Sequence, residues 1–311
     1  MPLNSQTRIV LNQIKELGLP PLNELNPVQA REQAAMGDQF SPKPEPVASV
    51  KNCIIPSSEI DIPIRIYTPA GNPPFPIVVF FHGGGWVVGN LEAADSICRT
   101  LANQVGCIVV SVDYRLAPEH KFPAAVEDAY TATEWVAKNA ASFQGDPERI
   151  AVGGDSAGGN LAAVVALISR DRNFPSLVYQ LLFYPATQYG FDTDSHRQNG
   201  KDYLLTIELL VWFWHHYLSS AADGQNPHTS PLLADNLTHL PPGLIITAEY
   251  DPLRDEAEAY GMRLQQAGVS VKMTRYDGTI HGFVGMANVL DQGQEALAEA
   301  AAALKHRFAI A

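Results

Sequence analysis

A serine with a glycine two residues away on either side is the first pattern in this 311-residue chain that predicts chemistry. Gly154-Asp155-Ser156-Ala157-Gly158 lies between a short apolar run and a helical pattern rich in Ala, Leu and Val. Such a strand–turn–helix setting exposes the serine on a sharp turn, and the glycines let strand and helix approach closely. N–H groups at the start of the helix stabilise a developing oxyanion. The pattern predicts a nucleophile at Ser156 and an oxyanion donor at the N–H of Ala157.

Three consecutive glycines, Gly83, Gly84 and Gly85, follow His82 directly after another apolar run. Backbone N–H groups with no side chain in the way can hold a tetrahedral oxyanion. A phosphate-binding loop would favour a following Lys and Ser or Thr, and neither appears. We expect these glycines to form an oxyanion hole together with Ala157, with Gly84 and Gly85 as the main donors. His82 belongs to the same loop, and we expect it to hold the loop by hydrogen bonding rather than to act as a base.

A nucleophilic serine needs a base and an acid that orients the base, in the chain order Ser, Asp or Glu, His for this type of sheet. Seven histidines follow Ser156, and His281 is the one in a loop just past a predicted strand. Sheets of this kind place ligands at the carboxyl ends of their strands. Asp251 also follows a predicted strand and is the favoured acid. Asp255, one helical turn later, is the alternative, although its charge also suits a helix N-terminus.

Short apolar runs alternate with helical patterns through most of the chain. Continuous apolar strands alternating with helices predict a mostly parallel sheet with helices on both faces. A period of two over 60–66 adds a half-buried strand near a sheet edge, because Pro63 cannot donate to a ladder. The other expected strands are 76–81, 107–112, 150–153, 178–184, 243–250 and 269–276, and the expected helices are 94–105, 124–139, 158–170, 253–267 and 295–308.

Two segments interrupt this alternation. Residues 1–45 contain two helical patterns, the second over 27–39, and a proline-rich connector at 41–46 follows. This segment is either a simple extension or a mobile cover. Residues 188–240 separate two strands and contain a helix rich in large apolar groups, which need a packing partner. Both segments together would form a helical cap. The expected organisation is N-terminal cap helices at 1–45, core at 46–187, cap insertion at 188–240 and core at 241–311.

Composition narrows the class of protein. The net charge of −12 argues against nucleic-acid binding, which depends on basic residues, and against docking on an anionic membrane surface. The hydrophobic content of 46% and charged content of 17% fit a globular chain. The three cysteines, Cys53, Cys98 and Cys107, show no spacing typical of disulfide frameworks or zinc sites. We expect neither a transmembrane helix nor a signal peptide, and hence a cytoplasmic protein.

Taken together, the motifs resemble the hormone-sensitive-lipase-like group of α/β-hydrolases, the microbial carboxylesterases. The resemblance implies Ser156 as nucleophile, His281 as base, Asp251 as orienting acid and the glycine loop as oxyanion hole. It also implies a helical cap built from the N-terminus and an insertion. Ala257 departs from the family, in which many members have glycine there. The matching stretches are His82-Gly83-Gly84-Gly85-Trp86, Tyr114-Arg115-Leu116-Ala117-Pro118-Glu119, Gly154-Asp155-Ser156-Ala157-Gly158-Gly159, Asp251-Pro252-Leu253-Arg254-Asp255-Glu256 and His281-Gly282-Phe283.

We therefore expect an α/β-hydrolase domain with a helical cap that hydrolyses short- to medium-chain carboxylic esters through an acyl-enzyme. The expected partner is a small-molecule ester, without nucleic acid, stable membrane association, metal or cofactor, since no metal-ligand spacing such as H-E-x-x-H is present. Homodimers are common in the family that the chain resembles. The side chains expected to contact substrate are Trp86, Asp155, Leu204, Phe213 and Phe283.

Three alternatives use the same sheet. An amidase or deacylase would use the same triad on a C–N bond, and the motifs do not separate it from an esterase. A non-catalytic receptor, like the plant hormone receptors that resemble this family, would lack the catalytic histidine, whereas His281 is present. An oligopeptidase would usually carry a large additional domain, which 311 residues cannot hold.

Overall fold

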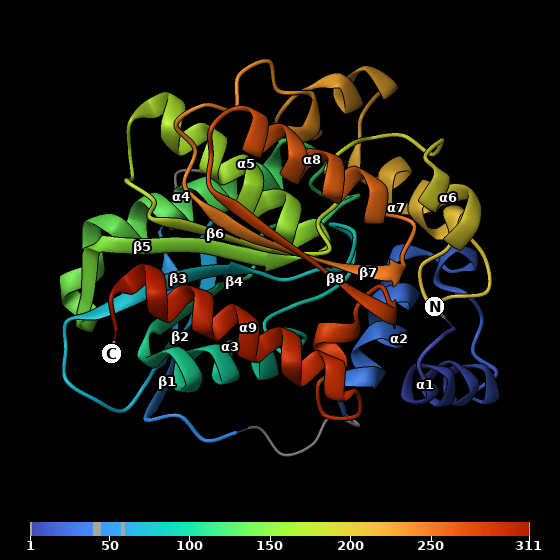
Figure 1. The fold of residues 1–311 in the computed structure, drawn as a ribbon, viewed down its shortest axis with the longest axis horizontal. Coiled ribbons are helices and arrows are strands. Elements are labelled where there is room, and N and C mark those ends of the chain that lie inside the picture. The colour runs from blue at the N-terminus through green and yellow to red at the C-terminus, as the bar shows by residue number, and fades with distance from the viewer. Residues whose placement is uncertain (1, 40–44, 57–59, 311) are drawn as a thin grey trace.

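The computed structural model describes residues 2–39, 45–56 and 60–310, and its eight strands within these ranges form one sheet (Figure 1). The six strands from β4 to β8 across the sheet are parallel, while β1 and β2 pair antiparallel with their neighbours. The expected α/β-hydrolase sheet is confirmed. In spatial order the strands are β1 (Ser49–Ile55), β2 (Ile62–Thr68), β4 (Ile108–Val112), β3 (Phe75–Phe81), β5 (Gly145–Asp155), β6 (Tyr179–Phe183), β7 (Gly243–Tyr250) and β8 (Val271–Ile280).

Helices cover both faces of the sheet, which explains the continuous apolar runs in its central strands (Figure 1). α4 (Ala124–Asn139), α5 (Ala157–Arg172) and α8 (Arg254–Gln266) pack on one face, and α3 (Asp95–Leu101) and α9 (Asp291–Phe308) pack on the other. The helix expected over 94–105 is divided, because a π-helical turn at Ala102–Gly106 follows α3. No helix in the described part of the chain is both long and apolar enough to cross a bilayer.

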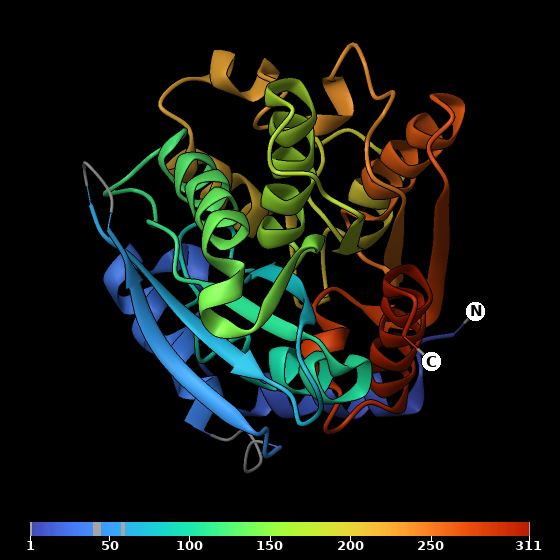
Figure 2. The ribbon, with the colours of Figure 1, turned by 90° about the vertical axis from the view of Figure 1, so that its left-hand side faces the viewer.

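The β1–β2 pair forms the edge of the sheet farthest from β8, as Figure 2 shows in light blue. The strand expected at 60–66 is β2, displaced by two residues, and its Pro63 lies opposite Ile54 of β1. β1 itself was not expected, because its first four side chains are exposed and only Ile55, at its end, is buried. The period of two is a clear signal only where alternate residues enter the core.

Two helices precede the sheet and are attached to it by specific hydrogen bonds. α1 (Ser5–Glu16) is held beside the end of β8, where the N–H of Asn4 donates to the carbonyl of Gly278 at 2.9 Å. α2 (Pro27–Gln39) is held by Arg31, which donates to the carbonyls of Val87 and Ala117 at 2.8 Å each and pairs with Glu119. The connector expected at 41–46 falls largely on residues 40–44, which lie outside the described residues.

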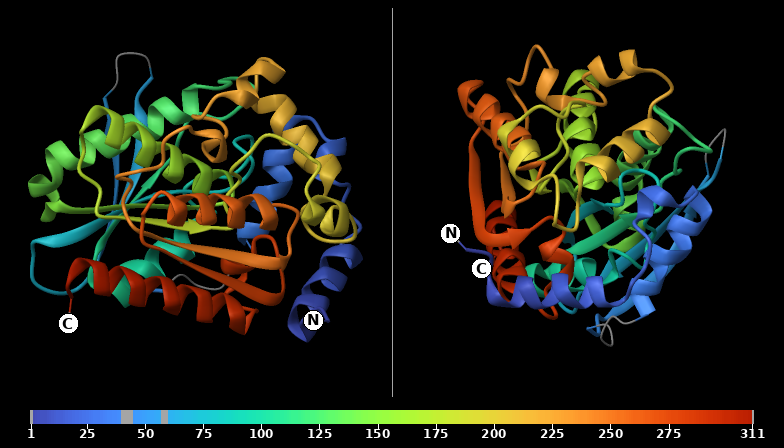
Figure 3. Two further views of the ribbon diagram at one scale, coloured as in Figure 1. Left: turned by 45° about the horizontal axis from the view of Figure 1, so that its top comes forward. Right: turned by 90° about the vertical axis from the view of Figure 1, so that its right-hand side faces the viewer.

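The segment between β6 and β7 contains α6 (Asp194–Asn199) and α7 (Ile207–Tyr217), followed by two short 3-10 turns, Ala221–Gln225 and Pro231–Leu233. In Figure 3 these helices lie at the carboxyl ends of the parallel strands, and the two N-terminal helices lie beside the same end of the sheet. The elements that the sequence placed outside the βα alternation therefore meet where this type of sheet binds its ligands.

Candidate active site

Ser156 occupies the sharp turn between β5 and α5. Its φ of 56° and ψ of −117° lie outside the regions that side-chain-bearing residues favour, and its N–H donates to the carbonyl of Phe183 at 2.9 Å. The two flanking positions have to be glycine because neither has room for a side chain. A Cβ at Gly158 would overlap the carbonyl oxygen of Phe81, and one at Gly154 would overlap the backbone of Gly158. The serine is thus held in a strained turn by backbone that tolerates no added side chain.

A chain of hydrogen bonds joins Ser156, His281 and Asp251. His281 Nε2 lies 2.9 Å from Ser156 Oγ, and His281 Nδ1 lies 2.7 Å from Asp251 Oδ2. A carboxylate only accepts, so Asp251 places the imidazole proton on Nδ1 and leaves Nε2 free to accept from the serine. Asp251 is fully buried, and its other oxygen accepts the N–H of Leu253 at 2.8 Å. The arrangement can remove the serine proton and stabilise the imidazolium that results.

Asp255, the alternative acid, has other partners. Its Oδ2 accepts the N–H of Ser195 at 2.7 Å, and its Oδ1 accepts from Arg254 Nε at 2.9 Å. These bonds hold its pKa below the ordinary value despite the opposing effect of burial. The structure therefore brings Asp251, and not Asp255, to His281.

The glycine loop, residues 83–85, differs in one respect from the expectation. The N–H of Gly83 donates to Asp155 Oδ1 at 2.9 Å, so it is not available to an oxyanion and its predicted donor role is wrong. Gly84 and Gly85 have φ values of 113° and 57° and line the cavity beside Ser156. No hydrogen bond within the described part of the chain uses their N–H groups. Ala157 is the first residue of α5, so its N–H has no partner inside the helix.

The half-buried Asp155 and the buried His82 hold the glycine loop in place. Asp155 accepts from Gly83, and burial raises the pKa of this carboxyl to about 6 against the opposing effect of that N–H. His82 Nδ1 lies 2.7 Å from the carbonyl of Gly83, and its ring stacks on Tyr114 with centroids 4.3 Å apart. Burial lowers the pKa of His82 to about 4, so the ring is neutral at pH 7. The expected loop-holding role fits this position.

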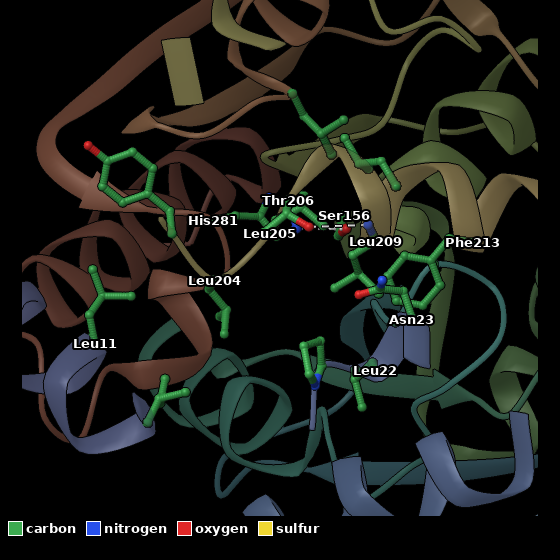
Figure 4. A pocket seen from close by; sticks show the side chains of 18 of the residues that line it. Leu11, Leu22, Asn23, Ser156, Leu204, Leu205, Thr206, Leu209, Phe213 and His281 are labelled. Atoms are coloured by element: carbon green, nitrogen blue, oxygen red, sulfur yellow. Dashed lines mark hydrogen bonds between the residues drawn. The ribbon is translucent and has the colours of Figure 1, made fainter. Parts of the chain in front are cut away.

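A cavity of about 1150 Å³ opens from Ser156 and His281 toward the N-terminal helices (Figure 4). Leu204 and Leu11 lie on the side of His281, and Leu209 and Phe213 lie on the opposite side. The lining is mainly apolar, with a few polar groups such as Asn23, which lies on the side of Phe213. The cavity has the mixture of apolar walls and few polar groups that is typical of small-molecule sites.

Four of the five side chains expected to contact substrate line this cavity: Trp86, Asp155, Leu204 and Phe213. Trp86 reaches it at the edge of an aromatic stack, since its ring lies parallel to that of Tyr217 at 4.2 Å. The prediction that Phe283 contacts substrate is wrong. This side chain is fully buried against Tyr184 and Tyr276, with ring centroids 5.8 and 5.3 Å away, so it packs in the core below His281.

The sequence reading missed the lining residues of the N-terminal segment, among them Leu11, Leu22 and Asn23. These residues belong to no motif, and their position depends on how α1 and α2 dock on the core. The hydrophobic pattern of α1 carries the one available signal, a helix whose apolar face needs a partner.

The fold and the geometry of this site define the class of protein: the chain belongs to the α/β-hydrolase fold family, whose model matches residues 78–285. Its relatives include carboxylesterase NlhH of Mycobacterium tuberculosis, 43% identical over 249 residues, which cover 79% of this chain and 78% of that protein. Ethyl acetate hydrolase of Pseudomonas putida is 36% identical over 251 residues, 79% of each chain. The structure of a hyperthermophilic esterase from the archaeon Pyrobaculum calidifontis matches with a TM-score of 0.94, 44% identity and full coverage of both chains.

Proposed function

We propose that this chain is a serine carboxylesterase that hydrolyses short- to medium-chain carboxylic esters by way of an acyl-enzyme. The observation that carries the proposal is the Ser156–His281–Asp251 hydrogen-bond chain at the end of an apolar cavity. The curated names of the relatives supply the choice of ester as the bond that is cleaved.

In the first half-reaction, Ser156 Oγ attacks the ester carbonyl while its proton moves to His281 Nε2. The tetrahedral oxyanion is held by the N–H groups of Gly84, Gly85 and Ala157, and Asp251 stabilises the imidazolium through Nδ1. His281 then gives its proton to the leaving alkoxide oxygen, and the alcohol departs. In the second half-reaction, His281 takes a proton from water as the water oxygen attacks the acyl carbonyl. His281 then returns this proton to Ser156 Oγ as the bond between that oxygen and the acyl carbon breaks, and the acid is released.

The two sides of the cavity suggest where the parts of the ester lie. The leaving oxygen must lie within reach of His281 Nε2, so we place the alcohol on the side of Leu204. The acyl chain then extends toward Phe213, which contacts the glycine loop so closely that a Cβ at Gly85 would overlap its ring. This ring limits the length of the acyl chain. We also propose that the segments 2–39 and 188–240 act together as the cap over the cavity.

The test is the hydrolysis of p-nitrophenyl esters from acetate to palmitate, with the corresponding p-nitroanilides, by the wild type and Ser156→Ala. We expect activity that peaks at short acyl chains, is far weaker on anilides and is lost in the variant. Equal activity in both proteins would refute Ser156 as the nucleophile. Preferential cleavage of anilides would instead favour an amidase, and a peak at long chains would overturn the proposed acyl length.

A further inference from the structure

The short helix α6 lies directly against the loop that carries Asp251. Three of its side chains, Ser195, His196 and Asn199, are buried, although α6 belongs to the segment between β6 and β7 and the loop belongs to the core. These residues are about 50 to 60 positions away from the loop in the sequence. The hydrogen bonds between the two elements are therefore tertiary contacts that the fold has to build.

The side chain of Asn199 binds two backbone carbonyls, one just before this loop and one at its first residue. Its Nδ2 donates to the carbonyl of Glu249 at 3.1 Å and to the carbonyl of Asp251 at 3.3 Å. Arg254 binds the same two acceptors from within the loop: its side chain donates to the Glu249 carbonyl at 2.9 Å and its N–H donates to the Asp251 carbonyl at 3.2 Å. Asn199 adds a bond to the Asp251 carbonyl from outside the loop. The β7–β8 register is irregular between Ala248 and Tyr250, and its last pair is Tyr250 with Ile280, so the ladder ends one residue before Asp251.

Ser195 binds the next part of the loop. Its Oγ donates to the carbonyl of Pro252 at 2.6 Å and accepts the N–H of Asp255 at 3.2 Å, while its own N–H donates to Asp255 Oδ2 at 2.7 Å. Ser195 is fully buried, so the Pro252 carbonyl and the N–H of Asp255 would each lose a partner without gaining water if the Ser195 hydroxyl were removed. The loop from Asp251 to Asp255 is thus attached to α6 along its whole length.

We propose that Asn199 and Ser195 are positioning residues for the triad, because they fix the backbone from which the Asp251 carboxylate reaches His281. This inference rests on the proposed function only for its kinetic readout. The carboxylate is held from one side by His281 and the N–H of Leu253, and its own peptide is held from the other side by Asn199. The segment between β6 and β7 then positions Asp251 as well as forming part of the cavity wall.

The first test compares Asn199→Leu with Gln180→Leu. Gln180 is a matched control, because it is also a buried amide whose Nε2 donates to a backbone carbonyl, that of Pro241 at 2.8 Å, near the amino end of β7. We expect both variants to lose stability. Only Asn199→Leu should lower kcat on p-nitrophenyl acetate, by about 10–100-fold, with KM within about threefold, because a displaced base fails in the transition state.

The second readout needs no substrate. We expect the proton on His281 Nδ1, which is hydrogen-bonded to Asp251, to give a low-field NMR resonance that Asp251→Ala would identify by abolishing it. We expect Asn199→Leu to shift or broaden this resonance and Gln180→Leu to leave it in place. A wild type that shows the resonance but hydrolyses no ester would refute the proposed function, and the response of the resonance to Asn199→Leu would still decide the inference.

Further variants separate a loss of positioning from a loss of folding. Ser195→Ala removes the hydroxyl, whereas Ser195→Thr keeps it, so we expect the threonine variant to recover the kcat that the alanine variant loses. In the Asp251→Ala background, Asn199→Leu should change the residual kcat by less than about twofold, since neighbours that act through one group are not additive. A wild-type kcat and resonance in folded Asn199→Leu or Ser195→Ala, or a full kinetic effect without Asp251, would overturn the inference.

Discussion

The bond between Asp155 and the glycine loop gives the sharpest prediction about the oxyanion hole. In Asp155→Ala the half-buried N–H of Gly83 loses its acceptor, and a hydrogen bond to a charged group is worth about 1.5–3 kcal/mol. The loop and this carboxylate are close together, since a Cβ added at Gly83 would lie 3.1 Å from the Asp155 carboxyl carbon. Removal of the side chain therefore frees the loop to move, and Gly84 and Gly85 move with it.

The size of the effect follows from the number of donors displaced. Loss of one oxyanion donor costs about 10²–10³ in kcat, or about 2.7–4 kcal/mol. Two of the three proposed donors, Gly84 and Gly85, belong to the freed loop, so we expect kcat of Asp155→Ala to fall by at least about 10². KM should change little, because these donors act on the transition state more than on the ester carbonyl.

The assay is steady-state hydrolysis of p-nitrophenyl acetate, with folding checked by circular dichroism. Asp155→Asn is the control, because its amide oxygen can still accept from Gly83, and we expect its kcat to stay within about tenfold of the wild type. A folded Asp155→Ala with kcat within about threefold of the wild type would refute the reasoning, since the loop would then hold its position without the bond.

Three other predictions follow from the same structure. Phe213→Ala should move the acyl optimum of the p-nitrophenyl series to longer chains, and an unchanged optimum would place the acyl chain elsewhere. Gly158→Ala should yield little folded protein on purification, because its Cβ overlaps the Phe81 carbonyl, and wild-type melting would contradict that overlap. Burial raises the pKa of Glu256 to about 8, above its value in the unfolded chain, so the folded state binds the extra proton and stability falls as pH rises from about 4.5 through 8. Glu256→Gln should remove a few kcal/mol of this fall in urea titrations at pH 5 and 9, and an unchanged slope would show that Glu256 is not its source.

The triad could be located from the sequence because each member stands at the end of a strand in a recognisable local pattern. Parallel strands bring their carboxyl ends to one edge, so Ser156, Asp251 and His281 meet there once the sheet forms. The choice between Asp251 and Asp255 was harder, because both lie within one turn of the strand end. The direction in which each side chain points, and not its residue type, decides which of the two reaches His281.

Other features depend on contacts that no local pattern records. Phe283 follows the histidine by two residues and is apolar, which suits a pocket or a core equally well, and the turn at Gly282 sends it into the core. Gly83 looks equivalent to Gly84 in the sequence, yet a carboxylate 72 residues away occupies its N–H. β1 is buried only at its end, so it lacks the alternation of buried and exposed residues that would have revealed it as a strand.

The aromatic stack behind the glycine loop gives the molecule a built-in optical probe. Trp86 directly follows the loop and Trp214 belongs to α7, and their ring centroids lie 4.5 Å apart at 48°. Two indoles this close and tilted couple their electronic transitions, so the pair should dominate the near-ultraviolet circular dichroism of the folded protein. The signal depends on one partner from the core and one from the segment above it. Stopped-flow circular dichroism could therefore test, without any attached label, whether these two layers change their relative position during turnover.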